Sequence, residues 1–95
     1  MQKAHLNLIN YAIANGHTIS VWDMGEWQVK KSTSYQDIKD AIDSVEMSEL
    51  SILNNKGKQV GWALIIDQGE PDETVSDYTI TPFMDAWEEH YNATV

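Results

Sequence analysis

The most apolar run in this sequence is Gln59-Val-Gly-Trp-Ala-Leu-Ile-Ile66. Large apolar side chains recur at every second position of the run, which is the period of a β-strand. The positions between them are apolar or small as well, so both faces of the strand would be hydrophobic. We therefore expect a central strand covered on both sides, with Trp62 in the core, or else a strand at the edge of a dimer.

A turn and another strand precede this run. The segment Asn55-Lys56-Gly57-Lys58 is a strong signal for a tight turn, and Leu50 and Ile52 alternate just before it. Residues 49–54 and 59–66 are therefore predicted to form a β-hairpin.

A second hairpin is predicted nearer the N-terminus, with strands at residues 17–22 and 26–31. In the turn between them, Gly25 can adopt a positive φ. Trp22 and Trp27 flank this turn and can pair across the strands, which would stiffen the hairpin. The alternative is that these two tryptophans are exposed and anchor a binding partner.

Apolar residues at helical spacing predict a helix over residues 2–14, and Asn15-Gly16 supplies a left-handed stop. A further helix follows the hydroxyl-rich segment Ser32-Thr33-Ser34. Two overlapping capping boxes fit its start, one from Thr33 to Gln36 and one from Ser34 to Asp37.

The last helix begins at Thr81-Pro82, with the threonine as N-cap and the proline at the first helical position. Phe83, Trp87 and Tyr91 recur at intervals of four residues and line one face of this helix. The chain is expected to fray from Asn92 onward.

The predicted element order is α-ββ-α-ββ-α. Its simplest packing is an α+β fold with a four-stranded, mainly antiparallel sheet and the helices packed on one face. A chain of 95 residues can bury one hydrophobic core, so residues 1–95 are expected to form a single domain. Residues 67–80 allow two interpretations: Pro71 can start a short helical turn, or residues 74–79 can be extended.

Negative charge is concentrated toward the C-terminus. The formal net charge is -9, all six cations are lysines, and residues 59–95 contain eight acidic residues and no lysine or arginine. These carboxylates lack a cationic neighbour in sequence, although lysines could reach them across space. A surface of this sign repels nucleic acid and anionic lipid, so neither is expected as a direct partner.

The acidic residues also form stripes on the predicted helices. Asp37, Asp40 and Asp43 recur every three residues opposite the apolar face of their helix, which roughly imitates a row of DNA phosphates. The alternative is an ordinary solvated face kept for solubility. The residues that we expect to bind a basic partner are Asp37, Asp40, Asp43, Glu70, Asp72, Glu73, Asp77, Asp85, Glu88 and Glu89.

Composition and motifs argue against catalysis and against a metal or cofactor site. The chain has no cysteine, which removes disulfides, thiolate catalysis and cysteine-based zinc sites. Since none of His5, His17 and His90 has a second ligand at metal spacing on its own helix face, all three are predicted at the surface and no metal or other cofactor is expected. No nucleophile elbow and no glycine-rich phosphate loop is found, so neither a catalytic residue nor an enzyme is predicted.

Four segments resemble small phage and prophage proteins of unassigned role. These segments are Ile19-Ser-Val-Trp-Asp, Glu26-Trp-Gln-Val-Lys-Lys-Ser-Thr, Gly61-Trp-Ala-Leu-Ile-Ile and Pro71-Asp-Glu-Thr-Val-Ser-Asp-Tyr-Thr. The resemblance would cover most of the chain and implies a host-takeover or counter-defence role in the bacterial cytoplasm. It carries no catalytic residue over to this sequence.

Three functions are therefore considered, of which a small enzyme or ligand binder is the weakest. The first is a non-enzymatic acidic inhibitor that occupies a basic, nucleic-acid-binding surface of a host protein, in the manner of a DNA mimic. The second is a self-associating structural or accessory module that dimerises through strand 59–66 or the Trp22/Trp27 hairpin, with acidity serving solubility. No apolar run reaches the roughly 18 residues of a membrane helix and no secretory signal opens the chain, so a cytoplasmic location is expected.

Overall fold

The computed structural model describes residues 3–23, 25–67 and 70–94. Within these ranges it contains three α-helices, five strands and one short 3-10 helix. In chain order the elements are α1 (Ala4–Ala14), β1 (Thr18–Asp23), β2 (Glu26–Ser32), α2 (Tyr35–Asp43), β3 (Met47–Leu53), β4 (Gln59–Ile66), η1 (Pro71–Glu73), β5 (Val75–Tyr78) and α3 (Pro82–Thr94). The α+β class is confirmed, but the sheet has one strand more than the predicted four.

The strands follow the order β2-β1-β3-β4-β5, and every neighbouring pair is antiparallel. β4 lies between β3 and β5, so the prediction of a central strand is confirmed and its backbone has no free edge for a dimer. Both interpretations of residues 67–80 were partly right, because Pro71 starts η1 and residues 75–78 form β5. Positions 68 and 69 lie outside the described residues.

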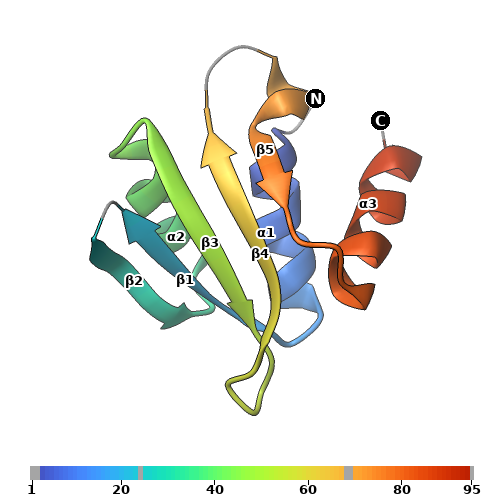
Figure 1. The fold of residues 1–95 in the computed structure, drawn as a ribbon, viewed down its shortest axis with the longest axis horizontal. Helices are drawn as coiled ribbons and strands as arrows, with labels where there is room; N and C mark the ends of the chain where they lie inside the picture. The colour runs from blue at the N-terminus through green and yellow to red at the C-terminus, as the bar shows by residue number, and fades with distance from the viewer. Residues whose placement is uncertain (1–2, 24, 68–69, 95) are drawn as a thin grey trace.

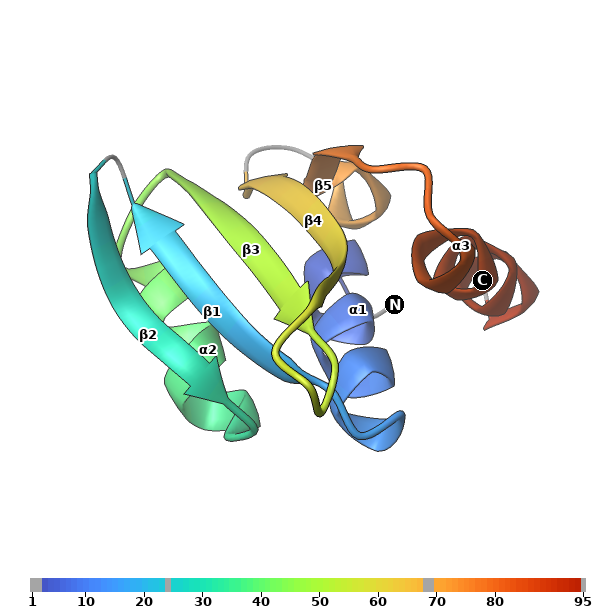
Figure 2. The same cartoon turned by 60° about the horizontal axis from the view of Figure 1, so that its bottom comes forward.

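The helices lie on one side of the sheet. Figures 1 and 2 show α1 and α2 against one face, with α3 beside α1 at the end formed by β4 and β5. The buried side chains of the central strands point toward these helices, at Ile19, Val21, Leu50, Ile52, Ala63 and Ile65. No helix of the described residues covers the opposite face, which we call the open face.

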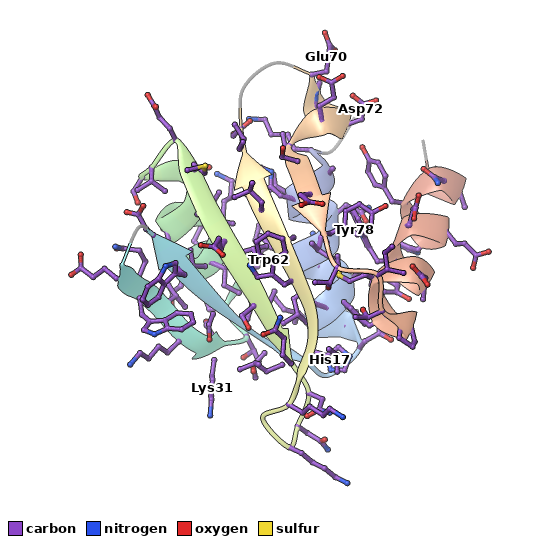
Figure 3. The ribbon with its side chains drawn as sticks, in the orientation of Figure 1. His17, Lys31, Trp62, Glu70, Asp72 and Tyr78 are labelled. Atoms are coloured by element: carbon purple, nitrogen blue, oxygen red, sulfur yellow. The ribbon has the colours of Figure 1, made fainter. Side chains whose placement is uncertain are left out.

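The expectation that β4 is covered on both sides is therefore wrong. Gly61 and Ala63 face the helices, and the alternating position Trp62 lies half-buried on the open face (Figure 3). Its indole Nε1 donates a hydrogen bond to Oε1 of Glu49 at 2.9 Å. A polar partner of this kind lets the large ring remain partly exposed instead of entering the core.

Side-chain caps fix the starts of two helices. Oγ of Ser34 accepts a hydrogen bond from the backbone N–H of Asp37 at 3.3 Å, so Ser34 is the N-cap. The second of the two predicted capping boxes forms only in this half, because the backbone N–H of Ser34 donates to Oγ of Ser32 at 3.0 Å. Oγ1 of Thr81 accepts from the N–H of Met84 at 3.2 Å, as predicted for the last helix. α3 has helical geometry as far as Thr94, two residues beyond Asn92, from which fraying was predicted.

Candidate functional site

A groove of about 250 Å³ lies between α3 and the segment formed by η1 and β5. Three aromatic rings and two carboxylates line it, at Asp72, Tyr78, Trp87, Glu88 and Tyr91. Figure 3 shows Asp72 and Tyr78 on the side of the sheet where α3 lies. The groove thus combines elements that are distant along the chain, and we call it the acidic groove.

The aromatic rings of the acidic groove are held in fixed positions. Trp87 lies edge-on to Tyr78, with ring centroids 5.8 Å apart, and stacks on Tyr91 at 5.6 Å. Nε1 of Trp87 donates a hydrogen bond to Oδ1 of Asn7 at 3.0 Å, which attaches α3 to α1. Since the indole is almost fully buried, this bond satisfies a donor that water does not reach.

Burial and the nearby carboxylates raise the pKa values of two phenols in the groove, Tyr78 and Tyr91. Burial raises the pKa of Tyr78, and a hydrogen bond to Glu88 and the charges of Glu88 and Asp85 raise that pKa further. Burial also raises the pKa of Tyr91, with the charge of Asp72 adding to the effect. The phenols therefore stay neutral at physiological pH beside exposed carboxylates.

This combination of groups suits an organic cation. A Lys or Arg side chain placed in the acidic groove would meet carboxylate oxygens at its charged end and aromatic faces along its stem. Among the described residues, no lysine lines the groove. Its negative charge is therefore available to a partner.

All ten acidic residues predicted to bind a partner are exposed. Those from Glu70 onward lie in η1, β5 and α3, the elements that form the acidic groove, or, for Glu70, directly before η1. The stripe on α2 lies elsewhere, because α1 stands between α2 and α3 (Figures 1 and 2). The two acidic helices therefore do not form one continuous patch.

Part of the α2 stripe has partners within its own helix. Nζ of Lys39 lies 2.6 Å from Oδ2 of Asp43, and the amide of Gln36 donates to Asp40 at 2.8 Å. An ion pair across space also forms in the C-terminal third, where Lys3 contacts Asp67 at 2.8 Å. The acidic groove is the better candidate for a partner's cation.

The open face of the sheet carries a second hollow, of about 270 Å³, lined by Trp22, Trp27 and Trp62 among others. Trp22 and Trp27 are register partners in β1 and β2, with ring centroids 4.7 Å apart in an edge-on arrangement. The predicted cross-strand pair is confirmed. Trp27 nevertheless remains 44% exposed, so the pair also presents an aromatic surface to solvent.

Comparisons of the chain with protein-family models, with curated proteins and with solved structures found no match. The site is therefore argued from its geometry alone. Within the described residues, no helix is both long enough and apolar enough to cross a membrane.

The structure corrects the prediction for one of the histidines. His90 is exposed and His17 is half-buried against the ring of Phe83, but His5 is fully buried. One ring nitrogen of His5 and one carboxylate oxygen each of Asp43 and Asp67 lie within 4.8 Å of one another. These residues come from α1, the end of α2 and the residue after β4, so spacing within one helix could not reveal the cluster.

Sequence reasoning identified the carboxylates of the acidic groove but not its aromatic lining. Trp87 and Tyr91 were predicted only to share one face of the last helix, and Tyr78 lay in the segment for which two interpretations were left open. A usable signal was present, because Glu88 directly follows Trp87 in a segment that contains no cation.

Proposed function

We propose that this chain is a non-enzymatic binding protein that docks on a basic surface of a partner protein. In this proposal the acidic groove receives a Lys or Arg side chain of the partner, and the surrounding carboxylates steer the approach. The observation that carries the proposal is the placement of Asp72 and Glu88 beside three ordered aromatic rings in one groove.

The partner surface that we propose is one that binds nucleic acid. Such surfaces present clustered lysines and arginines, and an acidic protein can occupy them in place of phosphates. The resemblance to small phage proteins supports a bacterial host protein in the cytoplasm as the partner. A standard interface needs about 800 Å² from each side, a modest part of the 5414 Å² of accessible surface in this molecule.

A pulldown from bacterial lysate at low and moderate salt, read by mass spectrometry, tests the proposal. We expect a nucleic-acid-binding protein to be captured, released by rising salt and competed off by added DNA or RNA. The double variant Asp72→Asn/Glu88→Gln should capture less of it than the equally charged control Asp37→Asn/Asp40→Asn. Capture that is insensitive to salt and to nucleic acid would contradict the proposal.

The open face supports a second candidate function, self-association. A cross-strand tryptophan pair and Trp62 line one hollow on a sheet face that no described helix covers. Large aromatic side chains in such a position are typical of interface anchors. Because β4 has a neighbour on both sides, the homodimer would form through this face and the Trp22/Trp27 hairpin, not through an edge of strand 59–66.

A further inference from the structure

The side chain of His5 is the least satisfied polar group in the core. It is fully buried, and neither Nδ1 nor Nε2 has a hydrogen-bond partner among the described residues. Its backbone N–H donates to Oγ1 of Thr74 at 3.1 Å, which leaves the ring itself without a partner among these residues. Buried polar atoms nearly always have a partner, so a bare imidazole here calls for a ligand.

The surroundings of His5 supply the other half of a site. Asp43 and Asp67 each bring a carboxylate oxygen to its ring nitrogen, and the three atoms lie within 4.8 Å of one another. An ion placed at the centre of these three atoms would lie no more than about 2.8 Å from each of them. In zinc sites, nitrogen and oxygen ligands lie about 2.0–2.2 Å from the ion. Small rotations of the two aspartates, which are not buried, would close the difference.

The positive charge that these aspartates attract is now provided by lysines. Nζ of Lys3 lies 2.8 Å from Oδ2 of Asp67, and Nζ of Lys39 lies 2.6 Å from Oδ2 of Asp43. Both lysine side chains are more than a third exposed, Lys3 at 45% and Lys39 at 34%. An ion that binds both carboxylates can therefore displace the two ammonium groups into water.

We propose that His5, Asp43 and Asp67 bind one divalent transition-metal ion, with Zn²⁺ as the leading candidate. An imidazole nitrogen together with carboxylate oxygens favours zinc and its first-row neighbours over Mg²⁺ and Ca²⁺, which take oxygen ligands. Water would fill the remaining positions, as in other sites with three protein ligands. The bound ion would connect α1, the end of α2 and the end of β4, and would stabilise the folded chain.

A metal ion binds the neutral form of an imidazole. The site does not depend on the acidic groove, so this inference and the proposed function can fail separately.

The first test is calorimetric titration of the full chain, stripped with EDTA, with ZnCl₂. We expect saturable binding of one Zn²⁺ per chain and a higher Tm with zinc present. Removing even the outer partners of a metal ligand weakens binding about 10- to 100-fold, so Asp43→Asn and Asp67→Asn should each weaken it at least about tenfold. The matched control His90→Gln, which removes an exposed histidine outside the cluster, should bind as the wild type does.

Because His5 is fully buried, replacing it would also disturb the core, so the role of His5 is tested in the wild type by NMR. Zn²⁺ should shift the ring nitrogens of His5 and leave those of His17 and His90 in place. Lys39→Met removes a competing cation and should tighten binding. The proposal is overturned if no saturable binding occurs, if both aspartate variants bind as tightly as the wild type, or if only His17 or His90 responds.

Discussion

Gly61 of β4 lies directly against Met84 of α3. A Cβ atom at position 61 would stand 2.7 Å from Sδ of Met84, closer than real Cβ contacts come. Both residues are buried, and Met84 is fully enclosed by other side chains, so it cannot move away into solvent. The missing side chain therefore allows α3 to approach β4 this closely.

The first prediction follows from this contact. Gly61→Ala should lower the free energy of unfolding by about 1–3 kcal/mol, because an added methyl group overpacks a full core. Urea denaturation measures the loss. In a double-mutant cycle with Met84→Ala, the Gly61→Ala penalty should shrink, since the space is then free. Equal penalties in both backgrounds would show that the contact does not limit packing.

The second prediction concerns the bond between α1 and α3. Asn7→Ala leaves the buried Nε1 of Trp87 without its acceptor, which should cost about 1–3 kcal/mol of unfolding free energy. Asn10→Ala is the control, because Asn10 is exposed on the same helix. Urea unfolding of both variants gives the comparison. Similar stabilities for the two would mean that water replaces the amide.

The third prediction tests the acidic groove with a defined ligand, an oligolysine peptide. Binding measured by calorimetry should weaken as salt rises, because exposed charges are screened. Asp72→Asn/Glu88→Gln should weaken binding more than Asp37→Asn/Asp40→Asn, although each variant removes two charges. Equal losses would indicate that the peptide responds only to net charge and not to the groove.

The fourth prediction concerns pH. The pKa of Tyr78 is raised above 10.0 by burial first and then by Glu88, so the unfolded chain loses this proton before the folded chain does. The unfolded state then binds fewer protons, and the stability contributed by Tyr78 is lost as pH rises above about 10. Wild type should therefore lose more stability on alkalinisation than Tyr78→Phe does.

Absorbance titration of the phenols checks the cause of this shift. Glu88→Gln removes a charged neighbour and should move the Tyr78 midpoint back toward its ordinary value. Glu89→Gln removes the adjacent exposed carboxylate and serves as the control. A Tyr78 midpoint that is identical in Glu88→Gln and in wild type would exclude the proposed hydrogen bond.

Local periodicity was sufficient to predict the helices and both hairpins. The strand period of β4 and the caps at Ser34 and Thr81 depend on residues close in sequence, and these appear. The period did not show which face of β4 is buried, because the large side chain of Trp62 lies on the open face and the small Gly61 and Ala63 face the helices. β5 was left open because it has only four residues and two of them, Ser76 and Asp77, are exposed. It forms because β4 offers a partner, which is information that the segment itself does not carry.

The candidate sites were also predictable only in part from the sequence. The negative charge around Asp72 and Glu88 is visible in composition, whereas the rings beside them come together only when α3 packs next to β5. The cluster at His5 likewise brings together a residue of α1, the last residue of α2 and the residue that follows β4. Contacts between positions so far apart in sequence cannot be derived from spacing along one element.

The fifth prediction tests self-association through the open face. If Trp27 anchors a homodimer, light scattering should show the mass rising toward that of a dimer with concentration, and Trp27→Glu should keep the chain monomeric. Ile80→Glu is the matched control, because Ile80 is 89% exposed but lies outside the strands. The same apolar-to-acidic change there should leave the dimer intact, since it adds charge without altering the aromatic hollow. A wild type that stays monomeric at every concentration, or a dimer lost equally in both variants, would leave the tryptophan pair with only its role in the hairpin.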